Sequence, residues 1–167
     1  SSSSNNSTGN SGAVYIYKRT GTSWTQEAYL KASNNDENDN FGYEIAMDGN
    51  TLAVTARYED SNQTTITNGT SSSSNNSNSN SGAVYIYKRT GTSWTQEAYI
   101  KASNSGVNDT FGSYVALDND TLAVTARQED SNQTTITNGT SSSSNNSTGN
   151  SGAVYIYKRT GTTWAQE

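Results

Sequence analysis

The sequence predicts an all-β protein built from tandem repeats, and three observations support this fold class. The motif Ser-Gly-Ala-Val-Tyr-Ile-Tyr-Lys-Arg-Thr-Gly-Thr begins at Ser11 and recurs at Ser81 and Ser151, which gives a period of 70 residues. The apolar residues form short blocks rich in Val, Ile, Tyr and Trp between Ser/Asn/Thr runs, a spacing typical of strands and polar loops. No block shows the period of an amphipathic helix.

The repeats divide the chain into residues 1–70, residues 71–140 and a partial third copy, residues 141–167, all within one array. This amounts to about 2.4 repeats of 70 residues. The first two copies differ at 14 positions. Ten of these differences lie between residues 35 and 50 of the first copy, in one loop and the strand that follows it. We therefore expect a constant strand framework with one variable loop.

Four strands are expected in each repeat. In the first copy they cover residues 13–18, 24–31, 43–47 and 51–55. The Asp48-Gly49 pair predicts a tight hairpin turn, because Gly accepts the positive φ that such a turn requires. Both alternating faces of the first strand are apolar, which indicates a sheet that is covered on both sides. Tandem four-stranded antiparallel sheets of this kind are typical of β-propeller blades.

Composition and charge exclude several classes of function. The net charge of −5 argues against nucleic acid or an anionic membrane surface as a partner. The absence of His and Cys removes the commonest general base, the thiol nucleophile and disulfides. The adjacent carboxylates Glu59-Asp60 would point to opposite sides of a strand, unlike the facing carboxylates of a glycosidase. No run approaches the roughly 18 apolar residues of a membrane span. We therefore expect neither an enzyme nor membrane insertion.

Three stretches of the repeat fit a known pattern. Residues 39–46, Asp-Asn-Phe-Gly-Tyr-Glu-Ile-Ala, fit D-x-F-G-x-x-V-A, and residues 49–56, Gly-Asn-Thr-Leu-Ala-Val-Thr-Ala, fit G-D-x-L-x-V-G-A. Residues 11–17, with Gly21 and Trp24, fit G-A-V-Y-V-Y…G…W. In these stretches the chain resembles the FG-GAP repeat, the blade unit of integrin α-like β-propellers. The resemblance implies a propeller-type fold. Unlike many relatives, the chain has no G-A-P triplet, and its acidic loop is diluted with Ser and Asn.

One loop of the first copy is a candidate calcium site. Hard cations prefer oxygen ligands, and alternate Asp and Asn residues resemble the start of a calcium loop. The candidate ligands are Asp36, Asn38, Asp39 and Asn40. The alternative is a polar loop in which Asp39 and its counterpart Asp109 bond the local backbone. Ca²⁺ is the one cofactor that the sequence suggests.

Two further sets of residues are singled out. Asn-x-Ser/Thr sequons are candidate N-glycosylation sites in a secreted chain, and they begin at Asn5, Asn6, Asn62, Asn68, Asn75, Asn132, Asn138, Asn145 and Asn146. Aromatic residues are expected to pack between blades, namely Tyr15, Tyr17, Trp24, Phe41, Tyr85, Tyr87, Trp94 and Phe111. The tyrosines could alternatively form a surface on which sugars stack.

A closed propeller needs roughly 4–8 blades, more than these repeats supply. The terminal sheets would then expose apolar faces, so we expect a fragment of a longer repeat protein or a chain that associates with copies of itself. The expected function is an extracellular structural or adhesive module of a surface or fibre protein. Its expected partners are copies of itself, adjacent repeats, glycans or surface proteins. The alternative is an integrin-like ligand-binding propeller that uses Ca²⁺ and its blade loops.

Overall fold

The computed structural model describes residues 7–167, and this part of the chain contains strands and no helix. It therefore contains no helix long and apolar enough to cross a membrane. The predicted all-β fold is confirmed. The strands are β1 (Val14–Thr20), β2 (Ser23–Leu30), β3 (Phe41–Asp48), β4 (Thr51–Ala56), β5 (Thr67–Asn68), β6 (Ala83–Thr90), β7 (Ser93–Ile100), β8 (Phe111–Asp118), β9 (Thr121–Ala126), β10 (Ala153–Thr160) and β11 (Thr163–Gln166).

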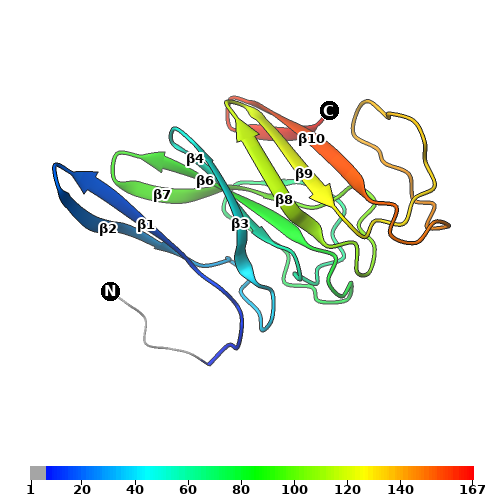
Figure 1. Ribbon diagram of the computed structural model, residues 1–167, viewed down its shortest axis with the longest axis horizontal. Coiled ribbons are helices and arrows are strands. Elements are labelled where there is room, and N and C mark those ends of the chain that lie inside the picture. The colour runs from blue at the N-terminus through cyan, green and yellow to red at the C-terminus, as the bar shows by residue number, and fades with distance from the viewer. Residues whose placement is uncertain (1–6) are drawn as a thin grey trace.

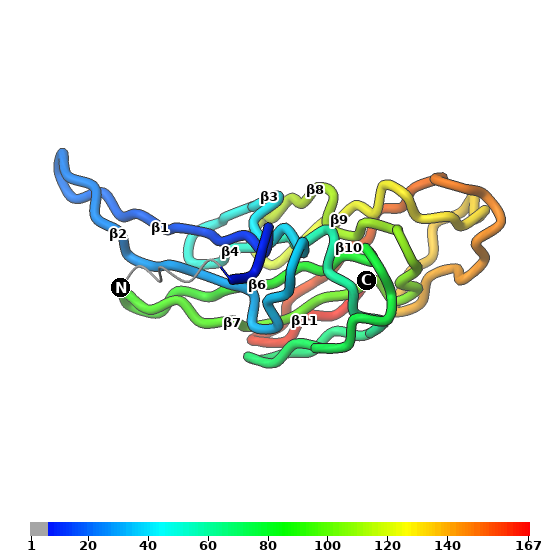
Figure 2. The backbone as a smooth tube through the Cα atoms, turned by 90° about the horizontal axis from the view of Figure 1, so that it is seen from below, coloured from blue at the N-terminus to red at the C-terminus, as the bar shows by residue number. Residues whose placement is uncertain are grey.

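The strands form three antiparallel sheets that lie side by side (Figure 1). The first is the hairpin β1–β2, the second has the order β3-β4-β6-β7-β5, and the third has the order β8-β9-β10-β11. Sheets two and three therefore share one four-stranded antiparallel plan, to which the second adds the short strand β5. The hairpin β1–β2 projects at one end of the molecule, and the loop after β9 lies at the other end (Figure 2).

Each complete sheet combines two successive copies of the sequence repeat. In the second sheet, β3 and β4 come from the first copy, whereas β6 and β7 come from the second. Strands β4 and β6 pair in continuous register from Thr51↔Lys88 to Ala56↔Ala83, although a loop of more than twenty residues separates them in sequence. The structural unit is thus offset by half a repeat from the sequence period. The hairpin β1–β2 is accordingly the counterpart of β6–β7.

Neighbouring sheets are joined by backbone contacts at the start of β3 and β8. Phe111 N donates a hydrogen bond to Ser81 O at 3.0 Å, and Phe41 N donates to Ser11 O at 3.1 Å. The residue after each serine is a glycine with positive φ, and a Cβ atom on Gly82 would lie 2.0 Å from Phe111 O. Only glycine therefore permits the two backbones to approach so closely.

The two faces of each sheet carry different apolar side chains because successive residues of a strand point to opposite sides. On β6, Tyr85 and Tyr87 point to one side, the tyrosine face, and Val84 and Ile86 point to the other, the valine face. One core lies between the valine face of β1–β2 and the tyrosine face of the second sheet. A second core lies between the valine face of the second sheet and the tyrosine face of the third. Every sheet therefore faces its neighbour in the same sense.

The close approach at Gly82 generates a stability prediction. We expect Gly82→Ala to lower the free energy of unfolding by at least about 3 kcal/mol, because the new methyl group collides with Phe111 O and φ is positive. Gly91→Ala is the matched control, since its φ is also positive but its Cβ meets nothing within 4 Å, and it should cost about 1 kcal/mol. Urea denaturation measures both. Equal losses would contradict the role assigned to Gly82.

Candidate functional site

Among the described residues, aromatic contacts and charged hydrogen bonds join neighbouring sheets. At the centre of each interface a phenylalanine meets two tyrosines edge-on. The ring of Phe111 lies 5.3 Å from that of Tyr155 and 6.2 Å from that of Tyr157. Phe41 repeats these distances with the two tyrosines of β6. Such edge-to-face pairs contribute roughly 0.5–1.5 kcal/mol each beyond the area they bury.

The aromatic residues expected to pack between blades fall into two groups. Phe41, Tyr85, Tyr87 and Phe111 are buried, and Trp94 packs partly buried against the first core. By contrast, the side chains of the first hairpin are exposed, by 55% at Tyr15, 53% at Tyr17 and 65% at Trp24. They lie on the tyrosine face of β1–β2, which no sheet among residues 7–167 covers. Their environment therefore depends on a neighbouring sheet.

A Glu–Arg–Trp clamp joins neighbouring sheets beside the turn that connects β6 and β7. Glu27 on β2 accepts hydrogen bonds from Arg89 Nε at 2.8 Å and Nη2 at 2.5 Å, and from Trp94 Nε1 at 3.2 Å. The bidentate geometry is that of a strong charge-assisted contact. The hydrogen bond from Arg89 lowers the pKa of Glu27 to about 2.

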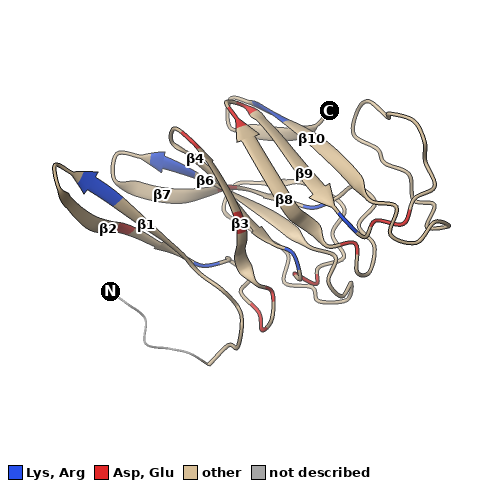
Figure 3. Ribbon diagram, in the orientation of Figure 1, with Lys and Arg blue, Asp and Glu red and all other residues tan. Residues whose placement is uncertain are grey.

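The same clamp recurs one repeat later. Glu97 on β7 accepts from Arg159 Nε at 2.7 Å, Arg159 Nη2 at 2.8 Å and Trp164 Nε1 at 3.1 Å. The arginines of the two clamps lie near the ends of β6 and β10, in the segments coloured blue in Figure 3. Because each clamp links two sheets, it fixes how far one sheet slides along the other.

The loop between β4 and β6 also contacts the next sheet. Its residues 67–68 form β5, which pairs with Tyr99 and Ala98 of β7. The Asn68 amide then binds the backbone of β11, since Oδ1 accepts from Trp164 N at 2.8 Å and Nδ2 donates to Trp164 O at 3.4 Å. Ile66 packs against the second core. This loop therefore contributes to the interface between the second and third sheets as well as to the solvent-exposed surface.

A buried ion pair lies at the opposite end of the second sheet. Lys101 Nζ donates to Glu59 Oε2 at 2.8 Å and to Ser81 Oγ at 2.7 Å, with both charged side chains almost fully buried. Burial lowers the pKa of Lys101, and the Glu59 carboxylate opposes that shift. Glu59 Oε1 accepts a further hydrogen bond from Asn34 at 2.9 Å, and Asn34 Oδ1 accepts one from Tyr85 at 2.6 Å. The network thus links the loop between β2 and β3 to strand ends of the second sheet and to Tyr85 in the core.

The four candidate calcium ligands make separate contacts. Asp39 is buried, and its Oδ2 accepts a hydrogen bond from Asp36 N at 3.0 Å. Asp36 Oδ2 accepts from Asn76 at 2.9 Å, and Asn38 Oδ1 accepts from Asn10 at 3.0 Å. Both Asn38 and Asn40 have positive φ. Among residues 7–167 no group of three or more acidic side chains is arranged to hold a metal ion. Asp39 and Asp109 bond the local backbone, as the polar-loop alternative states.

The candidate glycosylation sites differ in their surroundings. Asn5 and Asn6 lie outside the described residues. Most of the others have exposed side chains on the loops, namely Asn62, Asn75, Asn132, Asn138, Asn145 and Asn146. Asn68 differs from these residues because its side-chain amide forms hydrogen bonds with the backbone of Trp164. Its counterpart Asn138 makes no such contact within the described chain and lines a cavity.

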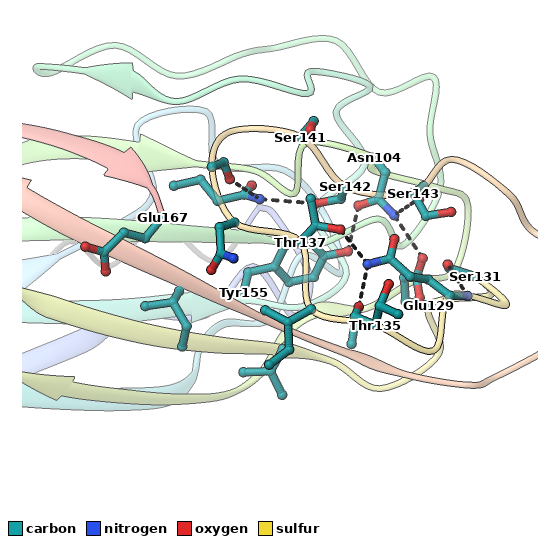
Figure 4. Close-up of a pocket in the computed structure, with 18 of the residues that line it drawn as sticks. Asn104, Glu129, Ser131, Thr135, Thr137, Ser141, Ser142, Ser143, Tyr155 and Glu167 are labelled. Atoms are coloured by element: carbon teal, nitrogen blue, oxygen red, sulfur yellow. Dashed lines mark hydrogen bonds between the residues drawn. The ribbon is translucent and has the colours of Figure 1, made fainter.

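This cavity has a volume of about 610 Å³ and lies on the valine face of the third sheet. Figure 4 shows it between the loop that carries Thr135 and Thr137 and the strand that carries Tyr155, with Glu167 at its rim. In the second sheet the corresponding space contains the last residues of β7, which pair with β5. Its polar lining comes mainly from Ser, Thr, Asn and Gln side chains, and the carboxylates of Glu129 and Glu167 also line it.

Sequence reasoning missed the two ionic contacts that join the sheets. Glu27 and Arg89 are 62 residues apart, and the same offset separates Glu97 from Arg159. The recurrence of both partners at the 70-residue period was a usable signal. It did not show which glutamate meets which arginine, because the sheet offset of half a repeat was unknown.

The buried ion pair generates a second prediction. We expect Lys101→Met to lower the free energy of unfolding by about 3–5 kcal/mol, because it leaves the Glu59 carboxylate buried without its cation. Lys88→Met is the control, since Lys88 is partly exposed and binds the hydroxyl of Thr51. It should cost less than about 1 kcal/mol. The double variant Lys101→Met/Glu59→Gln should recover part of the loss in urea denaturation, and no recovery would contradict the ion-pair explanation.

The buried carboxyl of Asp39 generates a pH prediction. Its pKa rises from 3.8 to about 7, mainly through burial and also through the nearby carboxylates Glu59, Asp36 and Asp60, while the hydrogen bond from Asp36 N opposes the shift. The folded protein therefore holds this proton more tightly than the unfolded chain, so the stabilisation is complete below about pH 4 and is lost as the pH rises through about 7. Asp39→Asn keeps an acceptor and cannot ionise. Relative to wild type it should be more stable at pH 8 than at pH 4 in urea denaturation; equal effects at both pH values would refute this.

The FG-GAP repeat model matches residues 24–87 and 94–157, which together make up more than half of the chain. Each match runs from the outer hairpin of one sheet to the third strand of the next. A search of curated proteins found no significant match. FG-GAP repeats are known in extracellular and adhesion-type proteins, and such proteins are in general structural or binding modules. With two matches and the expected antiparallel sheets, the chain belongs to the FG-GAP repeat family.

Proposed function

We propose that this chain is a structural or adhesive repeat module of an extracellular surface or fibre protein. Its sheets stack face to face, and its polar loops face water. Copies of the chain, or further repeats of a longer chain, extend the stack. Glycans or surface proteins are the partners proposed for the loops.

One observation carries this proposal, namely the contrast between equivalent residues inside and at the end of the stack. Val84 and Ile86 are fully buried between the second and third sheets, whereas their counterparts Val154 and Ile156 are 65% and 37% exposed. An apolar sheet face in water is unfavourable, by roughly 25 cal/mol for each Å² that a neighbour would cover. The identical residues support a further sheet as the natural cover of this face.

The loops support the extracellular part of the proposal. Their exposed sequons at Asn62, Asn75 and Asn132 could carry N-linked glycans on a secreted chain. The buried and backbone-bonded carboxyl of Asp39 favours a structural role over a calcium-dependent one.

Negative-stain electron microscopy of the purified chain tests the proposal. We expect regular fibres or rings whose repeat matches the thickness of stacked sheets, at about 10 Å per sheet. The variant Val154→Asp, which places a charge on the exposed valine face, should reduce the assembly. Thr92→Asp, on the exposed turn between β6 and β7, is the control for added negative charge. Dispersed single particles at all protein concentrations would count against a self-assembling structural module.

A further inference from the structure

The Glu–Arg–Trp clamp has members left over at both ends of the stack. Its glutamate occurs at the 70-residue period as Glu27, Glu97 and Glu167. The first two are clamped, whereas Glu167 is exposed and takes part in no ion pair among residues 7–167. At the other end, Arg19 and Trp24 are the counterparts of the clamped Arg89 and Trp94. Both are exposed, and no ion pair of the described chain includes Arg19.

We propose that Glu167 of one chain binds Arg19 and Trp24 of a second copy, so that copies join head to tail. This inference rests on the proposed function and names the contact that carries it. The geometry is taken from the two clamps already present, in which the carboxylate accepts two hydrogen bonds from the guanidinium and one from the indole. The opposite charges of the two ends favour this occupant, since each end lacks what the other presents.

The apolar surfaces of the two ends are complementary in the same way. One end exposes Val154 and Ile156 on the valine face of the third sheet. The other exposes Tyr15 and Tyr17 on the tyrosine face of β1–β2. Within the chain, a valine face and a tyrosine face always meet, and both become buried. A second copy therefore repeats a contact that this sequence already makes.

The loop at the exposed valine face also carries residues whose counterparts contact the next sheet inside the stack. Inside the stack, Ile66 packs against the next sheet and Asn68 binds the backbone of Trp164. At the end, the counterpart Ile136 is 89% exposed, and Asn138 borders the 610 Å³ cavity (Figure 4). In the proposed joint, Asn138 binds the backbone of Trp24 in the second copy.

The joint between copies differs from the joints within the chain in one respect. Inside the chain, each β6-type hairpin is continued in its sheet by an inner hairpin such as β3–β4 or β8–β9. The hairpin β1–β2 has no such continuation among the described residues. We expect self-association through this joint to depend on protein concentration.

Charge reversal measured by sedimentation velocity tests this contact on the full chain. We expect E167R and R19E each to weaken self-association by about tenfold or more, because each places like charges in the joint. An equimolar mixture of E167R and R19E should associate again, since it contains the reversed pair and the original pair. E37R and R127E are matched controls on exposed side chains that have no part in the proposed contact, and they should associate like wild type. Thermal unfolding verifies that all four variants fold.

The outcomes separate this contact from the wider proposal. Rescue in the mixture supports the head-to-tail joint. If the wild-type chain assembles in the microscope and E167R and R19E associate as strongly as wild type, the joint is overturned and the proposed function stands. A chain that is monomeric at every concentration overturns the joint and also counts against self-assembly. If E37R and R127E weaken self-association as much as E167R and R19E do, the effect is due to net charge and the joint is overturned as well.

Discussion

Both faces of every sheet in this chain are apolar, and this constraint governs the rest of the structure. Along β6, tyrosines point to one side while valine and isoleucine point to the other, and all become fully or almost fully buried. A sheet of this kind cannot keep one face in water without losing much of its stabilisation. The only arrangement that satisfies every sheet is a stack in which each member covers the next. The repeat unit is therefore stable through its neighbours, as in other repeat proteins.

Apolar contacts alone would allow one sheet to slide or turn on another. The Glu–Arg–Trp clamps, which join one sheet to the next, remove this freedom. The Lys101–Glu59 pair, with its serine and asparagine partners, holds together the strand ends of the second sheet. Buried ion pairs contribute little net stability because desolvation offsets their attraction, but they penalise any arrangement that leaves a partner alone. Their role here is to set the position and direction of stacking.

The half-repeat offset between sequence and sheet strengthens the array. Because β3 and β4 come from one copy and β6 and β7 from the next, each sheet ties two copies together through continuous backbone hydrogen bonds. The loop that crosses between them also reaches the following sheet through Asn68. A repeat is thus linked to its neighbours by backbone as well as side chains. This explains why the chain can keep long Ser- and Asn-rich loops while its apolar fraction is only 29%.

The sequence by itself determined the strands, the antiparallel hairpins and the requirement for two covered faces, since these follow from side-chain alternation and turn residues such as Asp48-Gly49. Burial of Phe41 and Phe111 follows from the same pattern. Only the tertiary structure decided which hairpins share a sheet, because strand pairing between copies joins residues 27 to 37 positions apart, and local patterns do not encode such pairs. The same long-range pairing placed Glu27 beside Arg89 and left Tyr15 and Trp24 exposed. A side chain's partner is set by the neighbouring sheet, and local sequence carries no information about that neighbour's offset.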